Sequence, residues 1–295
     1  MHSPKIDSPF LVPFDGDFCI ADAPSSPLED MGRKKCEKRL EASVKAMRDL
    51  QRILYAHDHH SVLLVFQAMD AAGKDSTIRS VMTGVNPAGC RVVSFKKPSA
   101  NELDQDFLWR SARVLPQRGQ IGIFNRSYYE EVLVVRVHPD YLGGQNIPGV
   151  SSSNLSEGFW EERLESIRDH EKHLARNGTL ILKFFLNVSR DEQKNRFLRR
   201  IDRPDKNWKF NAGDLVERKL WPAYMDAYEA ALNGTSRPWA PWFAIPADEK
   251  PYMRMQVAEI VVEALEGLDL KYPKLDKAER ARLADMRKLL EDEEE

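Results

Sequence analysis

The sequence predicts an α/β fold in which a mostly parallel sheet is covered by helices on both faces. Short runs of apolar, branched residues alternate along the chain with longer segments whose apolar residues recur every three or four positions. The apolar runs lack the alternating polar residues of a half-exposed strand, which is typical of strands buried on both faces. The segments between them are long enough to cross back over the sheet as helices, and such crossovers are right-handed.

Length and composition indicate a soluble globular protein. The chain has 295 residues, of which 42% are hydrophobic and 31% charged, and its net charge is −2. No change in composition marks a boundary, so we expect a single domain over residues 1–295. The overall charge does not by itself predict a polyanionic partner. Nucleic-acid binding is not expected, because the basic stretches lack an aromatic stacking module.

The cysteines and the apolar runs indicate in which cellular compartment the protein is expected. Cys19, Cys36 and Cys90 are odd in number and widely spaced, which supports neither a disulfide framework nor a metal cluster. The N-terminal stretch "MHSPKIDSPFLVPFDGDF" carries acids and lacks a continuous apolar core, which argues against a secretory signal. No apolar run approaches the ~20 residues that span a bilayer. We therefore expect a cytoplasmic protein without membrane association.

The first elements can be assigned in order. Residues 1–30 are rich in Pro, Ser and Asp and predict an extended arm that lies over a neighbour or stays mobile. Apolar residues at spacings of three and four then predict an amphipathic helix from Met31 to about Ala56. The run "SVLLVFQ" predicts a buried strand, followed by a loop over Ala68–Lys74. The segment "STIRSVMTG" continues as a helix that ends near Gly84.

The middle of the chain repeats this alternation. "RVVSF" predicts a strand, and "NELDQDFLWRSARVL" predicts a helix with Asn101 as its N-cap and Pro116 after its end. "GQIGIFN" predicts another buried strand. "SEGFWEERLESIRDHEKHLARNG" predicts a helix capped by Ser156, and "TLILKFFLNV" predicts the strand that follows it.

The last third continues in the same way. "SRDEQKNRFLRRI" predicts a helix capped by Ser189, and "AGDLVERKLWPAYMDAYEAALNG" a further helical region. "WFAIPA" predicts a short strand, and the segment from Pro251 to about Gly267 predicts a helix. The final residues, "LLEDEEE", predict a solvated acidic tail.

The stretch "FQAMDAAGKDST" follows the pattern of a phosphate-binding loop with two departures. In G-x-x-x-x-G-K-[ST], backbone N–H groups surround a phosphate chain, the Lys reaches its terminal groups and the hydroxyl binds Mg²⁺. Gly73 and Lys74 match this pattern, whereas Ala68 replaces the first glycine and Asp75 replaces the hydroxyl residue. Strand, loop and helix follow one another as the motif requires, which favours a phosphate site over a solvated turn. The loop residues expected to bind phosphate with Lys74 are Ala71, Ala72, Gly73, Asp75 and Ser76.

A second strand end, "GIFNRSYYEE", carries further candidates, because ligands gather at the carboxyl ends of parallel strands. P-loop enzymes place an acid here to hold Mg²⁺, but this chain has Asn125, which brings no negative charge. The carboxylate must therefore come from elsewhere, first from Asp70, with Asp75 and Glu130 as alternatives. Arg126 follows at once, and its guanidinium suits an acceptor phosphate; the alternative is an ordinary strand-end ion pair.

A third feature is the basic stretch "RDEQKNRFLRRIDRPDKNWK", from Arg190 to Lys209. On a helix, Arg196, Arg199, Arg200 and Arg203 fall on one face. In isolation this pattern predicts a solvated surface helix. Beside a phosphate loop it favours a mobile lid, over about residues 196–222, that neutralises a phosphoryl group in transfer.

Together these motifs resemble the polyphosphate kinase 2 family. The family's ordered motifs match this sequence at Met69–Asp75, Phe124–Tyr129, Glu192–Arg200, Trp208–Lys209 and Pro241–Lys250. The resemblance covers roughly residues 30–270. It implies a P-loop kinase fold of the thymidylate kinase type, a three-layer α/β/α sandwich, and reversible transfer of phosphate between inorganic polyphosphate and nucleotides. It also implies Mg²⁺, with Mn²⁺ as the alternative, adenine nucleotides, with guanine nucleotides as the alternative, and a homotetramer.

The resemblance also implies roles for single residues. Asp70 would bind Mg²⁺, Lys74 would contact the phosphoryl group in transfer, and Arg126 would hold the acceptor's phosphate. Two residues, Arg196 and Arg200, would belong to the lid, and two more, Lys206 and Lys209, would line the polyphosphate path. Because polyphosphate has no base or sugar, the altered loop would need no purine pocket for its donor.

The departure at Asn125 points to a subgroup. Many family members have Asp at this position, and "DFLWR" with "FNRSYYEEVLVVRVH" resembles the subgroup that accepts both AMP and ADP. We hypothesise that the shorter AMP leaves a gap near the metal that tolerates a neutral amide. Two other functions stay open: an ATP-dependent kinase of a nucleotide or small metabolite, and a non-catalytic polyphosphate- or nucleotide-binding protein.

Overall fold

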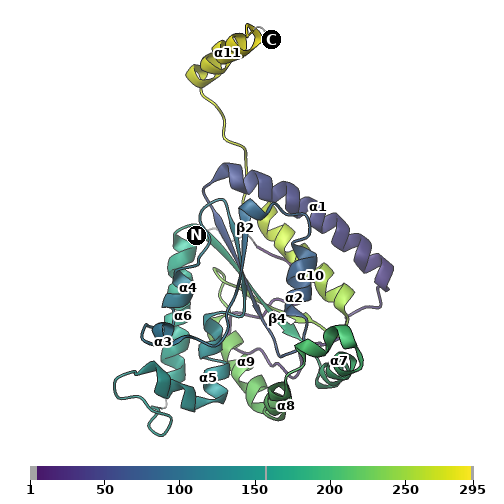
Figure 1. Cartoon of the computed structure of the whole chain (residues 1–295), viewed down its shortest axis with the longest axis vertical. Helices are drawn as coiled ribbons and strands as arrows, with labels where there is room; N and C mark the ends of the chain where they lie inside the picture. The colour runs from purple at the N-terminus through teal and green to yellow at the C-terminus, as the bar shows by residue number, and fades with distance from the viewer. Residues whose placement is uncertain (1–4, 157, 294–295) are drawn as a thin grey trace.

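Five parallel strands form one sheet in the centre of the protein (Figure 1). The structure is a computed structural model that describes residues 5–156 and 158–293. In sheet order, the strands are β2 (Cys90–Ser94), β3 (Ile121–Asn125), β1 (Ser61–Gln67), β4 (Thr179–Asn187) and β5 (Trp242–Pro246). Every pairing between neighbours is parallel, which confirms the predicted sheet. The central strand, β1, is buried at every position, as its apolar sequence predicts.

Helices cover both faces of the sheet, so the fold is a three-layer α/β/α sandwich (Figure 1). On one face, α10 (Lys250–Glu266) packs between α1 (Arg33–His57) and α2 (Lys74–Val81). On the other face, α6 (Phe159–Arg176) packs on α9 (Trp221–Thr235). The predicted ranges of α1, α2, α6 and α10 agree with the structure to within a few residues at their ends. The predicted helical region over "AGDLVERKLWPAYMDAYEAALNG" is divided near Leu220, so that α9 forms only its second part.

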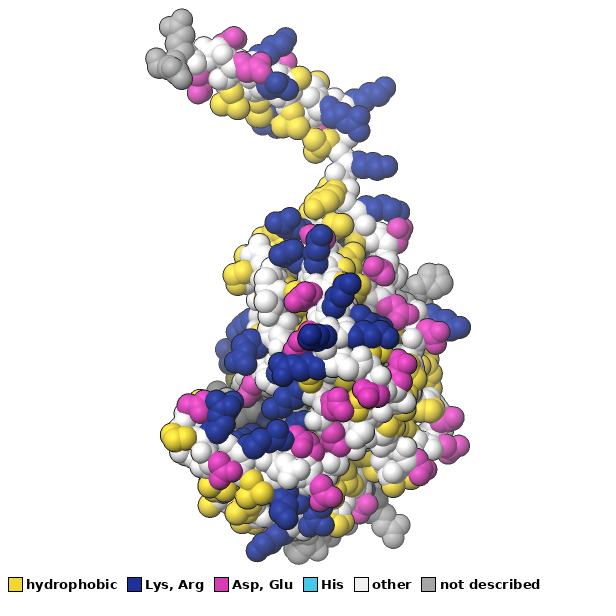
Figure 2. All heavy atoms as spheres, turned by 90° about the vertical axis from the view of Figure 1, so that its right-hand side faces the viewer, with side chains coloured by type: hydrophobic (Ala, Val, Ile, Leu, Met, Phe, Trp, Pro, Cys, Tyr) yellow, Lys and Arg dark blue, Asp and Glu magenta, His cyan; other side chains and the backbone are white. Residues whose placement is uncertain are grey.

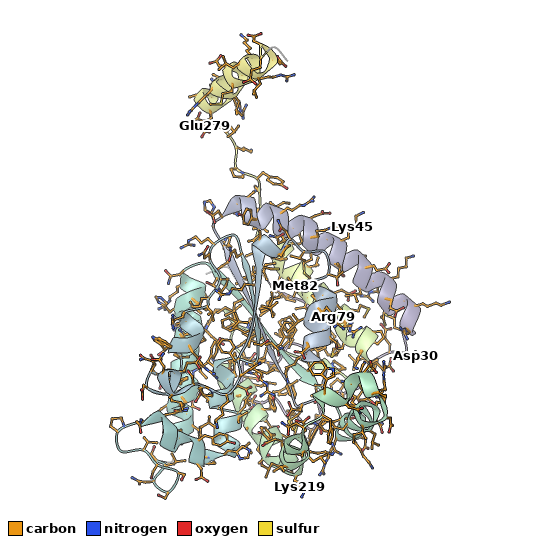
Figure 3. All side chains as sticks on the ribbon, viewed as in Figure 1. Asp30, Lys45, Arg79, Met82, Lys219 and Glu279 are labelled. Carbon is orange, nitrogen blue, oxygen red and sulfur yellow. The ribbon has the colours of Figure 1, made fainter. Side chains whose placement is uncertain are left out.

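Side chains fill the space between the layers (Figure 3). The amphipathic pattern of α1 buries Met47 and Leu54 completely and leaves Lys45 exposed on the outer face. Met82, at the end of α2, packs against the same core. Core packing therefore fixes α1 and α2 on this face of the sheet, and α2 continues directly from the phosphate-binding loop.

The predicted helix over "NELDQDFLWRSARVL" is wrong. This segment forms two short helices, α3 (Ala100–Leu103) and α4 (Trp109–Ala112), and Ser99 caps the first one in place of Asn101. Asp106 accepts a hydrogen bond from the backbone N–H two residues further on, and this local bond turns the chain between the two helices.

The predicted cap of α6 is also wrong, whereas that of the next helix is confirmed. Gly158 is the N-cap of α6, and Ser156 contributes only its backbone carbonyl, which accepts from the N–H of Phe159. Ser189 caps α7 (Arg190–Asp202) as predicted, because its hydroxyl accepts from the backbone N–H of Glu192 across 3.1 Å.

Short irregular elements surround the carboxyl end of the sheet and were not separated by the sequence pattern. After β3 and after β4 these elements are η2 (Tyr128–Glu131), α5 (Val134–Val137), η3 (Pro139–Gln145), η4 (Pro204–Lys209) and α8 (Ala212–Lys219). A further short turn, η1 (Pro87–Gly89), precedes β2. They carry or frame most of the side chains of the site described below.

The N-terminal arm lies along the free edge of the sheet. Leu11 pairs antiparallel with Phe243 of β5, and the backbone N–H of Val12 donates to the carbonyl of Trp242 across 2.9 Å. Phe10 and Val12 are buried against the core. The arm therefore covers an edge that would otherwise expose unpaired backbone groups.

The C-terminal region adds a helix that the predicted acidic tail did not include. α11 (Lys277–Glu291) stands away from the rest of the protein (Figure 1), and residues 271–293 are all exposed. A capping box of Asp276 and Glu279 begins it. Across the described residues, none of the helices is both long enough and apolar enough to cross a bilayer.

Candidate active site

The carboxyl ends of all five strands open into one cleft of about 820 Å³. The loop after β1 and the start of α2 form its floor, and residues after β2, β3, β4 and β5 form its walls. This is the edge at which parallel sheets bind ligands. The sequence-predicted site residues that line the cleft are Asp70, Ala71, Ala72, Gly73, Lys74, Asp75, Ser76, Asn125, Arg126, Arg196, Arg200 and Lys206.

Two predicted residues are placed differently. Glu130 lies beside the cleft, in the lining of a neighbouring cavity, and contacts the site through Arg126. The side chain of Lys209 lies outside the part of the chain that the structure describes, although its backbone belongs to η4. The polyphosphate-path role expected for Lys209 therefore stays a prediction.

The cleft is strongly basic. Its lining includes eleven Lys and Arg residues but two carboxylates, Asp70 and Asp75. Arg199 and Arg203, which the sequence places on the basic face of the lid, are among these basic residues, and those that the sequence did not single out are Arg79, Lys96, Lys97 and Lys250. Figure 2 shows Lys and Arg side chains gathered around a hollow in the lower left of the molecule. A net charge of −2 for the whole chain thus hides a local positive field that suits a polyanion.

The loop after β1 has the backbone geometry of a phosphate cradle. Gly73 has a φ of 112° and Ala71 a φ of 62°, so two residues in the loop occupy the left-handed region. A Cβ at Gly73 would meet Met253 and Ser76 at 3.4 Å and would also strain the backbone. Glycine is therefore required there, whereas Ala68, buried directly after β1, needs no such freedom.

Lys74 begins α2 and points back over the loop. Its Nζ donates to the carbonyl oxygen of Ala68 across 2.6 Å and lies 3.4 Å from that of Met69. Desolvation, followed by the nearby charge of Arg126, lowers the pKa of Lys74 to about 8. Bound phosphate oxygens would favour the charged ammonium and raise this pKa again.

Side chains of α7 hold the phosphate-binding loop in place through hydrogen bonds to its carbonyls. Gln193 donates to the carbonyl of Asp70 across 2.9 Å. The guanidinium of Arg196, whose side chain is 4% exposed, donates to the carbonyls of Ala71 and Ala72 through Nη1 and to those of residues 247 and 248 through Nη2. Arg196 is thus tied to backbone, whereas Arg200 is partly exposed and reaches Asp214 of α8 at 3.3 Å.

Arg126 bridges two carboxylates at the end of β3. Its Nη2 lies 2.9 Å from Oδ1 of Asp70, and its Nη1 lies 3.1 Å from Oε2 of Glu130. The charge of Glu130, and to a smaller degree that of Asp70, raises the pKa of Arg126, so the guanidinium stays charged. Its φ of 63° is unusual for a residue with a side chain. The ion pair foreseen as an alternative role is present, and it lies inside the basic cleft.

Asn125 contacts the loop directly. Its Nδ2 donates to Oδ1 of Asp75 across 2.5 Å. The amide thus satisfies a carboxylate that a second carboxylate at this position would repel. Among the residues that the structure describes, no three His, Cys, Asp or Glu side chains are grouped so as to hold a metal ion.

A second cavity, of about 450 Å³, adjoins the cleft and was missed by the sequence analysis. It shares Lys96, Lys97 and Arg126 with the cleft. The rest of its lining combines apolar side chains, among them Leu103, Val134, Val135 and Tyr141, with the charged residues Arg110, Glu130, Glu131 and Asp140. Tyr141 is 53% exposed, and its ring stacks on that of His138 with the ring centroids 5.3 Å apart. The lining comes from α3, α5 and η3, whose short segments have no periodicity that would indicate a cavity.

Comparison with known proteins gives consistent results. A family model described as polyphosphate kinase 2 (PPK2) matches residues 30–273. An ADP-polyphosphate phosphotransferase of Rhodopseudomonas palustris is 55% identical over 251 residues, covering 85% of this chain and 86% of that protein. An AMP/ADP-polyphosphate phosphotransferase of Meiothermus ruber is 46% identical over 247 residues, covering 84% and 87%. The crystal structure of polyphosphate kinase 2 from Arthrobacter aurescens TC1 matches with a TM-score of 0.81 and 37% identity, covering 91% of this chain and 93% of that one.

Proposed function

The chain belongs to the polyphosphate kinase 2 family, and on that premise we propose that it transfers phosphoryl groups between inorganic polyphosphate and the adenine nucleotides AMP and ADP. The observation that carries the proposal is the basic cleft around the loop of Lys74. Among the described lining residues of this cleft, the one aromatic side chain is Phe95, which is buried and offers no face to a purine. A donor that consists only of phosphates suits such a cleft better than ATP does.

Each of the two cavities would bind a different substrate. The basic cleft would hold polyphosphate, and the smaller cavity would hold the nucleoside of the acceptor, with its base near Tyr141. Lys96, Lys97 and Arg126 lie on the boundary, where the acceptor's phosphates would meet the donor. This division supports a nucleotide acceptor, because a small metabolite would not need a second cavity of about 450 Å³.

The side chains of the cleft supply positioning and positive charge. In the transfer, the bond between the terminal phosphorus of polyphosphate and its bridging oxygen breaks, and a bond forms to an acceptor phosphate oxygen. Lys74 would neutralise the oxygens of the moving group, Arg126 would hold the acceptor phosphate, and Arg200 would approach from the lid over residues 196–222. One phosphoanhydride bond replaces another, so we expect the reaction to be reversible.

A divalent metal is part of this proposal, with Mg²⁺ as our choice. Asp70 is the first candidate to hold it, with Asp75 next, and both carboxylates line the cleft. Such a small donor set fits Mg²⁺, which commonly binds one or two carboxylates together with substrate phosphates and water. When bound, the ion would neutralise charge on the phosphates.

The experiment that tests the proposal uses purified full-length protein with polyphosphate as the sole phosphate donor. AMP and ADP are offered separately, with and without Mg²⁺, and ADP and ATP are measured. We expect metal-dependent formation of both products. Transfer from ATP to a small acceptor, without any transfer from polyphosphate, would instead favour an ATP-dependent kinase. Tight polyphosphate binding without turnover would favour a binding protein.

Assembly is a separate prediction. The resemblance to the family leads us to expect a homotetramer. Size-exclusion chromatography with light scattering would give the mass in solution, to be compared with the 33.9 kDa of one chain.

A further inference from the structure

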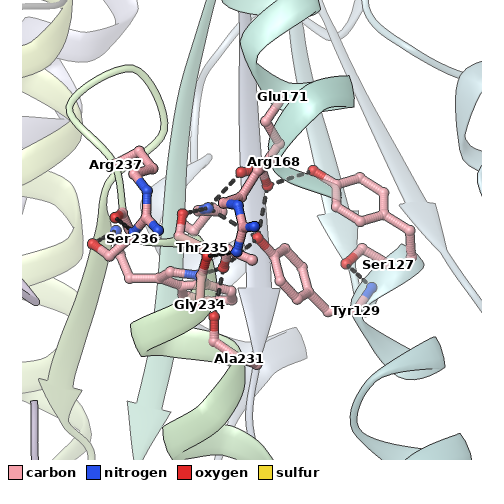
Figure 4. Close-up of polar contacts among 12 residues, drawn as sticks. Ser127, Tyr129, Arg168, Glu171, Ala231, Gly234, Thr235, Ser236 and Arg237 are labelled. Atoms are coloured by element: carbon pink, nitrogen blue, oxygen red, sulfur yellow. Dashed lines mark hydrogen bonds and ion pairs between the residues drawn. The ribbon is translucent and has the colours of Figure 1, made fainter. Parts of the chain in front are cut away.

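A buried polar network lies in the core next to the segment that follows Arg126. Lys183 of β4 donates from Nζ to Oε2 of Glu171 at 2.6 Å, to the hydroxyl oxygen of Tyr129 at 2.9 Å and to the carbonyl of Thr235 at 2.8 Å. The Tyr129 hydroxyl donates to Oε1 of Glu171 across 2.8 Å. The side chains of Lys183, Glu171 and Tyr129 are at most 1% exposed. Figure 4 shows Glu171, Tyr129 and Thr235 converging from three different elements.

Stability alone does not account for such a network. Removing two charges from water costs several kcal/mol for each ion, so a buried ion pair is often no more stabilising than apolar side chains of the same volume. Burial lowers the pKa of Lys183 to about 8, which reflects this cost. The network instead fixes the positions of its side chains, because each hydrogen bond restricts where its donor and acceptor can lie.

The network fixes the segment that carries Arg126. Tyr129 lies three residues after Arg126, in η2, and the hydroxyl of Ser127 between them accepts the N–H of Tyr129 across 3.1 Å. On the other side, the N–H of Arg126 donates to the carbonyl of Phe66 in β1 across 3.0 Å. Arg126 is therefore held between β1 and the buried ring of Tyr129.

This support matters because Arg126 has a strained backbone. A left-handed conformation is unfavourable for a residue with a side chain and persists only where the surroundings enforce it. A φ of 63° directs the guanidinium to Asp70 and Glu130. If the segment after Arg126 relaxed, the guanidinium would leave the boundary between cleft and nucleoside cavity.

We propose that Tyr129, held by Glu171 and Lys183, is a positioning residue for phosphoryl transfer that acts through Arg126. The proposal rests on the proposed function. Tyr129 does not line the cleft or the smaller cavity and would touch neither substrate. Its hydroxyl instead sets the place of the side chain that receives the acceptor phosphate.

The test measures AMP and polyphosphate kinetics of Tyr129→Phe, which keeps the ring but loses the hydrogen bonds to Lys183, Glu171 and Thr235. We expect kcat/KM for AMP to fall by about tenfold to a hundredfold, as for a misplacement of about 1 Å. KM for AMP should rise, while KM for polyphosphate changes by less than about twofold. Met47→Ala, at a buried position of α1 on the opposite face of the sheet, controls for plain destabilisation. It should leave both KM values unchanged.

A double-mutant cycle then tests whether the effect passes through Arg126. In an Arg126→Lys background, Tyr129→Phe should change kcat/KM for AMP by less than about twofold, because the group it positions is gone. The same loss in both backgrounds would overturn the proposal, as would an unchanged KM for AMP in Tyr129→Phe. If Tyr129→Phe does not fold, Glu171→Gln is subjected to the same cycle and the same criteria. A wild-type protein without polyphosphate-dependent transfer would overturn the proposed function itself, and this inference with it.

Discussion

Asn125 and Asp75 form the closest polar contact between the end of β3 and the phosphate-binding loop. In Asn125→Asp, two carboxylates would face each other across this contact, which costs about 1 kcal/mol or more unless a cation lies between them. We therefore expect the ratio of kcat/KM for AMP to that for ADP to change by about fivefold or more, and the demand for Mg²⁺ to change with it. Initial rates with each acceptor over a range of Mg²⁺ concentrations measure both quantities. An unchanged ratio would show that the amide does not contribute to acceptor choice.

Lys74 should dominate the activity. In Lys74→Ala, the ammonium that neutralises the moving phosphoryl group is lost, and we expect kcat to fall by about 10²–10³-fold. The fold should persist, because the hydrogen bonds of the Lys74 ammonium to described residues are those to the carbonyls of Ala68 and Met69. Circular dichroism and thermal unfolding of the variant provide the control. Activity close to that of the wild type would place the reaction elsewhere in the protein.

The same side chain predicts a pH dependence. In the free protein the pKa of Lys74 is about 8, and the ammonium is the active form, so kcat/KM for polyphosphate should fall as pH rises above about 8. Bound phosphates raise the pKa, so kcat should persist to higher pH. In Lys74→Arg, the alkaline fall near pH 8 should become smaller, because a guanidinium stays charged there. It should not vanish, because burial also lowers the pKa of Lys250, another residue of the cleft, to about 8. Equal pH profiles for the wild type and Lys74→Arg would contradict this assignment.

At the scale of elements, one side of α7 is bonded to the phosphate-binding loop and the other side is exposed. Arg196 donates to backbone carbonyls of the loop and of the segment after β5, whereas Arg199 is 60% exposed and contacts residues of its own helix, Glu192 and Asn195. Arg196→Gln should lower the free energy of unfolding by about 2–4 kcal/mol and reduce activity, because buried carbonyls lose a charged donor. Arg199→Gln, one turn away, should change stability by less than about 0.5 kcal/mol. Urea unfolding of the two variants gives the comparison, and similar losses in both would contradict this role of Arg196.

The elements that could be predicted from the sequence are those with a strong period or a continuous apolar run. β1, α1 and α6 are of this kind, because burial of their apolar side chains decides them. Wrong assignments fell where a local hydrogen bond outweighs the pattern, as at Asp106, which turns the chain between α3 and α4. α11 is exposed on all sides, so no core contact marks it.

The candidate site also has parts that could be predicted from the sequence and parts that could not. The loop around Lys74 and the strand end at Arg126 follow short motifs next to buried strands, so their place in the cleft could be predicted. The cavity near Tyr141 could not, because it is enclosed by short elements from distant parts of the chain. The bonds that Arg196 makes to the loop were equally invisible, since a pattern of basic residues does not distinguish a buried arginine from an exposed one.

At the scale of the whole molecule, the N-terminal arm completes the sheet. Deleting residues 1–24 would remove the buried side chains of Phe10 and Val12, each worth about 1.5–3 kcal/mol, and would uncover the edge of β5. We expect a loss of several kcal/mol in the free energy of unfolding and concentration-dependent aggregation, measured by urea unfolding and light scattering. Deletion of residues 271–295 is the matched control, because residues 271–293 are exposed. A similar loss in both deletions would show that the arm has no special role.

The basic cleft has a consequence for how long a donor stays bound. Lys and Arg side chains make up much of its lining, and polyphosphate consists of identical units. Each phosphate of the chain can therefore occupy the same binding positions. After one transfer, the shortened chain can advance by one unit and meet equivalent contacts again. We therefore expect the protein to be processive on long polyphosphate, consuming one chain through successive turnovers before it takes up another.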